Sequence, residues 1–155
     1  MLRPFLLTLL LAAAALFASA PAHAADEVFA TAEGAIRGYD PVAYHVQAKA
    51  VRGSPKFTHA WNGVTWRFAY RRNRDRFAAD PARYAPRYGG YCAYGTAQGY
   101  KVSTDPDAFA IVEGRLYLNF SKPVQATWNT DRPGHIASAD RNWRGLEHEA
   151  YQPER

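Results

Sequence analysis

The pair Asn62-Gly63 constrains this chain more than any other feature, because it joins two runs that read as strands, Phe57–Trp61 and Val64–Phe68. Asn-Gly is the pair that type I′ hairpin turns favour, and a two-residue loop fixes the register of the flanking strands. Counting outward from the turn puts six side chains on one face, paired as Trp61 with Val64, His59 with Trp66, and Phe57 with Phe68. The sequence therefore predicts a β-hairpin whose apolar face must be covered.

A second hairpin is predicted around Glu113-Gly114, a pair that favours a two-residue turn less strongly than Asn-Gly does. A turn at this point places four apolar side chains on one face: Phe109, Ile111, Leu116 and Leu118. Three Asp-Pro pairs, at Asp40, Asp80 and Asp105, mark boundaries between short elements. At the first of them Asp caps a short helix and Pro takes its first position.

Short helices are predicted from caps and apolar spacing. Asn73 is placed as the cap of a helix that runs to about Ala79, and Ser121 as the cap of another. Phe77 is predicted on the inner face of the first of these helices, and Val124 and Trp128 on that of the second. A C-terminal helix is predicted to turn Ile136, Ala139 and Trp143 inward. The chain has 155 residues, enough for one core. The predicted fold class is α+β: a small single domain of antiparallel hairpins with short surrounding helices.

The first 24 residues resemble a cleavable leader. Arg3 supplies a positive charge, an apolar run spans residues 5–20, and Ala22-His23-Ala24 matches a signal-peptidase site. We expect residues 1–24 to be a signal peptide, cut between Ala24 and Ala25, which would deliver the protein to the periplasm; a short membrane anchor is the alternative. No second long apolar stretch follows, so no transmembrane anchor is expected after cleavage. The remainder divides into a flexible arm over 25–37, a domain over 38–146 and a polar tail over 147–155 that is expected to fray.

Between Gly38 and Trp143 the chain contains, in this order, the stretches GYDPVAY, FTHAWNGVTWRF, NRDRFAADPARYAPRYGGYCAYG, DPDAFAIVEGRLYLNF and ADRNW. In content and order these stretches resemble exported proteins of the YHS-domain family. The resemblance implies a small α+β domain with a role in metal binding. The metal-binding form of the family carries cysteines where this chain has Ala43, Ala69 and Asn73. The resemblance therefore implies the scaffold without its usual thiolate ligands.

Cys92 is the only cysteine, which excludes an internal disulfide framework and a Cys-only zinc site. If a metal binds, the residues predicted to hold it are Cys92 and His59, and the soft ions Cu or Zn suit a sulfur–nitrogen pair. Cys92 has three alternatives: a small buried hydrophobe, a redox-sensitive thiol, or an intermolecular disulfide. The glycines around it let the backbone approach either a ligand or a packed neighbour. The alternative for His59 is a core histidine bonded to backbone.

A dense basic run follows the first hairpin: Arg67, Arg71, Arg72, Arg74 and Arg76. Positive charges at a helix N-terminus oppose the macrodipole, so Arg71, Arg72 and Arg74 are candidates for contact with an anionic partner. A solvated basic face is the alternative. Tyr91 is a further candidate contact for a ligand or partner, its alternative being a place in the core.

No catalytic motif of the G-x-S-x-G, H-E-x-x-H or P-loop kind occurs, so the chain is not expected to be an enzyme. Because the protein is expected to be exported, no nucleic-acid partner is expected. The sequence predicts a non-enzymatic periplasmic YHS-like domain that binds a small ligand or a protein, with copper or zinc as the candidate cofactor. The alternative is a metal-free module that contacts a protein or an anionic surface through the Arg67–Arg76 basic face.

Overall fold

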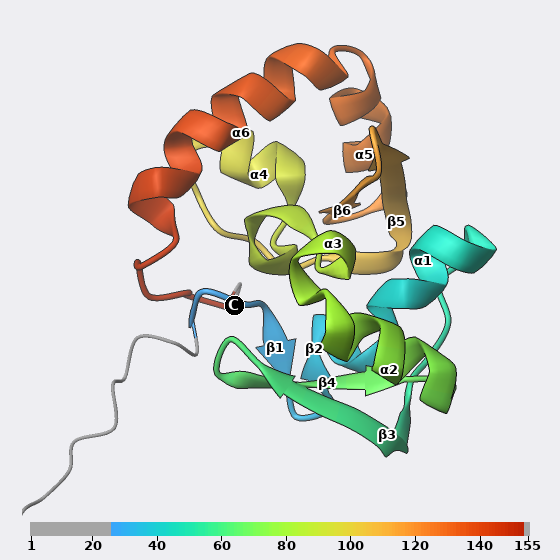
Figure 1. The fold of residues 1–155 in the computed structure, drawn as a ribbon. Helices are drawn as coiled ribbons and strands as arrows, with labels where there is room; N and C mark the ends of the chain where they lie inside the picture. The colour runs from blue at the N-terminus through green and yellow to red at the C-terminus, as the bar shows by residue number, and fades with distance from the viewer. Residues whose placement is uncertain (1–25, 154–155) are drawn as a thin grey trace, which may run out of the picture.

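The computed structural model describes residues 26–153; the predicted signal peptide over 1–24 and the last two residues of the tail lie outside them. Within that range the strands form three two-stranded antiparallel sheets, with helices packed around two of them (Figure 1). The predicted α+β class is confirmed. The elements are β1 (Ala30–Thr31), β2 (Gly34–Ala35), η2 (Ile36–Gly38), α1 (Pro41–Gln47), β3 (Ser54–Trp61), β4 (Val64–Phe68), α2 (Arg71–Ala79), α3 (Pro81–Tyr84), η3 (Arg87–Gly90), α4 (Ala93–Gln98), β5 (Asp105–Val112), β6 (Arg115–Asn119), α5 (Lys122–Asn129) and α6 (Arg132–Leu146).

The β3–β4 hairpin has the predicted type I′ turn, with φ of 51° at Asn62 and 75° at Gly63. Trp61 pairs with Val64, and His59 with Trp66, as predicted. The predicted pairing of Phe57 with Phe68 is wrong, because the register shifts between Ser54 and Thr58 and Phe68 pairs with Ser54 instead. This irregular stretch contains Pro55, which has no N–H to donate to the ladder.

The β5–β6 hairpin also has the predicted register: Ile111 pairs with Leu116 and Phe109 with Leu118. Both of its faces are used. Leu116 and Leu118 enter the larger core, whereas Ala110 and Tyr117, on the opposite face, enter a second cluster beneath α5 and α6. Ile111, near the turn, is more exposed than predicted, at 37%.

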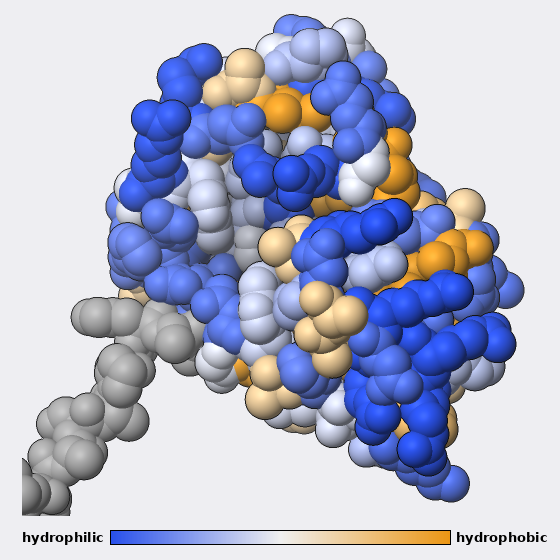
Figure 2. Space-filling model, in the orientation of Figure 1, coloured by the Kyte–Doolittle hydropathy of each residue, from blue (hydrophilic) through white to orange (hydrophobic). Residues whose placement is uncertain are grey.

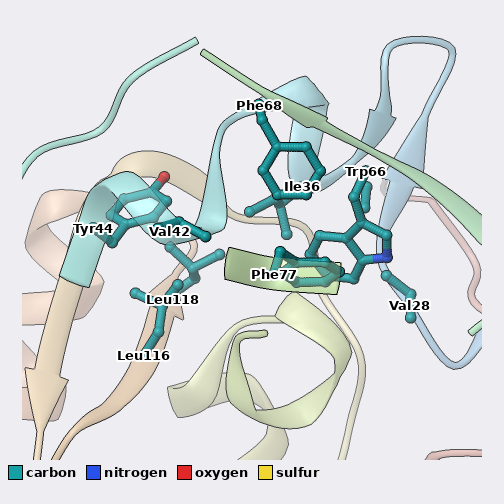
Figure 3. Packing of buried hydrophobic residues seen from close by; sticks show 10 residues of the cluster. Val28, Ile36, Val42, Tyr44, Trp66, Phe68, Phe77, Leu116 and Leu118 are labelled. Atoms are coloured by element: carbon teal, nitrogen blue, oxygen red, sulfur yellow. The ribbon is translucent and has the colours of Figure 1, made fainter. Parts of the chain in front are cut away.

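Phe77 of α2 lies at the centre of the larger core, where it was predicted to point inward (Figure 3). Its ring centroid is 5.1 Å from that of Trp66, 5.2 Å from Phe68 and 5.8 Å from Trp61. Figure 3 shows Leu116 and Leu118 reaching this core from β6, and Val42 and Tyr44 from α1. Aromatic rings therefore join the first hairpin to α2, as tilted and edge-on pairs of the kind that ring quadrupoles favour.

The second cluster lies under the C-terminal helices. Trp128 of α5 and Ala139 of α6 are fully buried there, and Ile136 and Trp143 pack against them, as the spacing predicts. α4 packs along α6 (Figure 1). Ser121 caps α5 by accepting the N–H of Val124, also as predicted. Between residues 26 and 153, no helix is both long enough and apolar enough to cross a bilayer.

The predicted cap at Asn73 is wrong. α2 begins at Arg71, with Tyr70 in the cap position and no side-chain hydrogen bond there. Asn73 is instead fully buried and donates from Nδ2 to Oδ2 of Asp40, 2.7 Å away. Asp40 was predicted to cap α1 and does so, accepting the N–H groups of Val42 and Ala43. The amide of Asn73 is thus used to satisfy a buried carboxylate from another helix.

The predicted flexible arm over 25–37 packs into the fold from residue 26 on. Val28, Phe29, Ala35 and Ile36 are each at most 3% exposed. The N–H of Phe29 donates to the carbonyl of Gly89, 2.9 Å away. A β-carbon on Gly89, whose φ is +61°, would lie 1.8 Å from the carbonyl oxygen of Glu27. The glycine-rich stretch before Cys92 therefore serves a packed neighbour here, because only glycine allows this approach.

The tail also packs, contrary to the expectation that it frays, as far as Tyr151. The Tyr151 ring lies 5.1 Å from that of Tyr91 and 6.0 Å from that of Phe29. The Lys101 ammonium donates to the carbonyls of Glu147 and Glu149. The first and last described segments therefore pack against each other. The polar composition of the tail did not predict this contact.

Candidate functional site

A pocket of about 260 Å³ opens beside Cys92, and we call it the Cys92 pocket. It is formed where the start of α4, the segment after α4, the end of β6 and α5 meet. The rings of Tyr100 and Phe120 remain 50% and 44% exposed at this pocket. Its lining is mostly apolar: Cys92, Tyr94, Gly95, Tyr100, Val102, Phe120 and Val124.

The Cys92 side chain is 1% exposed and lines this pocket. Its Sγ accepts the backbone N–H of Phe120 at 3.2 Å and that of Gly95 at 3.4 Å. The first N–H belongs to the residue that follows β6, and the second lies in the first turn of α4, where Cys92 is the cap residue. These two N–H groups hold the sulfur in a fixed position in the wall of the pocket.

Asn119 lies on the other side of the sulfur and is also fully buried. Its Oδ1 accepts the N–H of Tyr94 at 3.2 Å and the thiol of Cys92 at 3.6 Å. Its Nδ2 has no hydrogen-bond partner among residues 26–153. A buried amide donor left unpaired destabilises a fold by about 1–3 kcal/mol. A buried N–H donor without a partner, Asn119 Nδ2, therefore belongs to the same amide that accepts the Cys92 thiol.

Sequence reasoning missed Asn119 and Phe120. The available signal was their position, since they are the last two residues of the predicted second hairpin. That position alone does not show that the end of β6 returns to the start of α4. The contact between two segments 27 residues apart became visible only in the folded chain.

The structure does not bring His59 to Cys92. His59 lies on β3, and its ring packs edge-on against Phe77 of the larger core, with the ring centroids 6.0 Å apart. Figure 1 shows the β3–β4 hairpin at the bottom of the molecule and α4 in its upper half. Across residues 26–153 no group of three His, Cys, Asp or Glu side chains gathers that could hold a metal ion. The β3–β4 hairpin, whose rigidity made His59 a candidate metal ligand, also holds His59 away from the Cys92 thiol.

The three positions where the resemblance implies missing cysteines do come together, around Asp40. The carboxylate accepts the N–H of Ala43 at 3.2 Å, the N–H of Ala69 at 2.9 Å and the side-chain amide of Asn73 at 2.7 Å. All of these partners are protein groups, and Asn73 Oδ1 is buried without a hydrogen-bond partner within the described chain. The centre of this arrangement is a hydrogen-bonded carboxylate.

The basic run is divided by the fold. Arg71, Arg72 and Arg76 are exposed on α2, where Figure 2 shows a broad hydrophilic area at the lower right. Arg74 is half-buried and pairs with Asp75, with 2.6 Å between Nη2 and Oδ1. Arg67 lies outside this face, since its side chain lies close to Gly34, Gly38 and Gly53.

Tyr91 does not lie where a partner could reach it. The residue is 1% exposed, and its hydroxyl donates to the carbonyl of Asp26 at 3.0 Å. The Lys101 ammonium lies 5.0 Å from the centre of its ring. Burial raises the pKa of the Tyr91 phenol well above its usual range, so the hydroxyl stays neutral. Its role is to hold the docked terminal segments.

Comparison of the chain with protein families, with curated proteins and with solved structures finds no match.

Proposed function

We propose that this protein is a non-enzymatic binding domain that takes a small apolar ligand in the Cys92 pocket. The observation that carries the proposal is the pocket itself: a 260 Å³ apolar cavity with two partly exposed rings and a hydrogen-bonded thiol in its lining. Ligand sites are typically concave, mostly apolar and supplied with a few polar groups. The thiol of Cys92 is a polar group in this lining.

The test uses the fact that Cys92 is the only cysteine. The rate at which methyl methanethiosulfonate labels the folded protein reports access to the sulfur. Octanol, as an apolar probe, should slow this labelling in the wild type. Val124→Phe, which fills the pocket, should remove the protection by octanol, whereas the matched control Val46→Phe on the exposed face of α1 should keep it. An octanol-independent labelling rate in the wild type would contradict the proposal.

A soft metal held by Cys92 is the competing occupant. Copper and zinc analysis of untagged protein distinguishes the two. Near-stoichiometric metal in the wild type that is lost in Cys92→Ser and retained in His59→Ala would mean that the pocket holds a metal ion and not an apolar ligand. We expect metal far below one equivalent in all three proteins, because one thiolate without a second ligand binds weakly.

The proposal includes export to the periplasm and membership of the YHS-like scaffold. Protein recovered from a bacterial periplasm should begin at Ala25. The gathering of positions 43, 69 and 73 around Asp40 supports the scaffold. The combined variant Ala43→Cys, Ala69→Cys, Asn73→Cys should then gain one equivalent of zinc, while the same triple substitution by Ser should gain none. A start at Met1, or no zinc in the cysteine variant, would count against the respective part.

A second candidate function uses α2 as a contact for an anionic surface. It is favoured by one specific observation: Arg71, Arg72 and Arg76 are all exposed on this helix, and its one acidic residue, Asp75, pairs with Arg74 instead. Charge-reversal variants that test it are described in the Discussion.

A further inference from the structure

A second cavity adjoins the Cys92 pocket. It measures about 570 Å³, is open to solvent, and is named here the Arg37 groove. Phe120 lines both cavities, and the segment 100–104 runs from one to the other. The groove is lined by polar and charged groups on most sides: Glu33, Arg37, Tyr39, Arg52, Ser103, Thr104, Asp105, Pro106 and Phe120. A ligand whose apolar part occupies the Cys92 pocket can therefore place a polar group in the Arg37 groove.

The backbone that carries Arg37 is left-handed. φ is 44° at Ile36, 58° at Arg37 and 74° at Gly38. Positive φ is uncommon for any residue with a β-carbon and an outlier for a β-branched one such as isoleucine. At Asn62 and Glu113 the same conformation closes a two-residue hairpin turn, but Ile36 and Arg37 lie outside such turns. Backbone strain of this kind is concentrated at functional sites.

This conformation fixes the Arg37 side chain at the groove. Its Nε donates to the carbonyl of Thr104 at 3.0 Å, and its guanidinium carbon lies 5.4 Å from the centre of the Phe29 ring. The terminal N–H groups of Arg37 make no hydrogen bond to another residue in the range 26–153. A planar guanidinium held by one edge in this way can offer its free N–H groups to a carboxylate.

The other charged groups of the groove already have partners. Arg52 pairs with Glu33 at 3.8 Å, and Oδ1 of Asp105 accepts the N–H of Asp107 at 2.9 Å. Arg37 forms no ion pair with any residue of the described chain. It is therefore the groove's available cation, and it lies next to the apolar pocket through Phe120.

We propose that the Arg37 groove and the Cys92 pocket form one site for a carboxylate that carries an apolar chain. The chain occupies the pocket between Tyr100 and Phe120, and the carboxylate binds the free edge of Arg37. This inference rests on the proposed function, because it adds a charged head group to the apolar ligand.

Octanoate and octanol test the two parts separately, since they share a chain and differ in the head group. Calorimetry with the full chain should show octanoate binding about tenfold or more tightly than octanol. Arg37→Gln should bring octanoate down to the affinity of octanol and leave octanol unchanged. Arg37→Asn is the second variant, because asparagine tolerates the left-handed backbone and so protects the fold. Arg52→Gln is the matched control at the already paired arginine.

Equal affinities for octanoate and octanol in the wild type would overturn the inference and leave the proposed function standing. An octanoate preference that survives both Arg37 variants, with their thermal midpoints unchanged, would also overturn it. Binding of neither probe would overturn the inference and the apolar-ligand function together.

Discussion

Asn73, on α2, donates a 2.7 Å hydrogen bond to the carboxylate of Asp40, which caps α1. Both residues are fully buried. The same carboxylate accepts three backbone N–H groups, from Val42, Ala43 and Ala69, so one charged group closes the junction of α1, β4 and α2. A buried charge is tolerated when it is this fully hydrogen-bonded.

Asp40→Ala should lower the free energy of unfolding by about 3–5 kcal/mol, because it removes a helix cap and leaves three buried N–H groups and an amide unpaired. Asn73→Ala should lower it by about 1–3 kcal/mol, since the backbone donors remain. Urea unfolding followed by tryptophan fluorescence gives both values. Asp75→Ala is the control, because Asp75 is an exposed carboxylate on α2, the helix that carries Asn73. Its free energy of unfolding should stay within about 0.5 kcal/mol of the wild-type value. Equal effects for Asp40 and Asp75 would mean that the junction is not stabilised in this way.

Gly89→Ala should destabilise the protein by about 2–4 kcal/mol, because its β-carbon would overlap the carbonyl of Glu27 and its φ is positive. Gly99→Ala is the matched control: its φ is also positive, at +96°, but nothing lies within 4 Å of the new β-carbon. The control should therefore show only the left-handed backbone term, about 1 kcal/mol. Limited proteolysis should cut the Gly89 variant first near residues 26–29. Similar losses in both variants would show that the approach of the N-terminal segment contributes little.

His45 should make the protein less stable in mild acid. Its pKa is held below the ordinary value of 6.5, chiefly because the ring is half-buried against Tyr84, and also through the nearby charge of Arg83; a hydrogen bond to the Tyr84 carbonyl acts in the opposite direction. Below the ordinary value the unfolded chain takes up more protons at this site than the folded chain does. Stability therefore falls as the pH falls through and below 6.5.

His45→Gln keeps a donor for the Tyr84 carbonyl and removes this titration. The difference in urea midpoint between about pH 7 and about pH 5.5 should be smaller in the variant than in the wild type. An identical difference in the two proteins would assign the acid sensitivity to other groups.

If α2 contacts an anionic surface, binding to vesicles that contain anionic lipid should weaken steeply with salt, since charges are screened over about 10 Å at 0.1 M. Arg71→Glu, Arg72→Glu and Arg76→Glu combined should abolish it while the thermal midpoint changes little. The matched control reverses three exposed arginines that lie outside α2, namely Arg115, Arg141 and Arg144. Equal loss in both variants would indicate net charge alone, and no binding by the wild type would reject this candidate function.

The two hairpins could be predicted from sequence because a two-residue turn sets the register locally. Ile111 pairs with Leu116 as counted from Glu113-Gly114. The predicted pairing of Phe57 with Phe68 failed because it lies far from the turn, where an irregularity between Ser54 and Thr58 shifts the register. Asn73 was wrong for the same reason, since cap propensity is a local preference and its true partner is 33 residues away.

The candidate site was predicted in part. Cys92 stood out as the only thiol, and the structure places it in a pocket lining. His59 could not be excluded from sequence, because facing the apolar side of a hairpin does not reveal which core that side enters. Arg37 gave no signal, because a left-handed backbone outside a turn depends on tertiary packing. Asn119 gave only its position at the end of the second hairpin, because the return of β6 toward α4 also depends on tertiary packing.

The contacts of Phe29 with Tyr151, and of Glu27 with His148 at 2.9 Å, bring the two ends of the described chain to one place. A short glycine-serine linker could span that separation. A circular permutant that joins the ends this way and opens at the exposed turn Glu113-Gly114 should retain the core, because no buried side chain borders the new break. The strands β5 and β6 would then lie at opposite ends of the new sequence, and their pairing would have to form without the two-residue turn that joins them here.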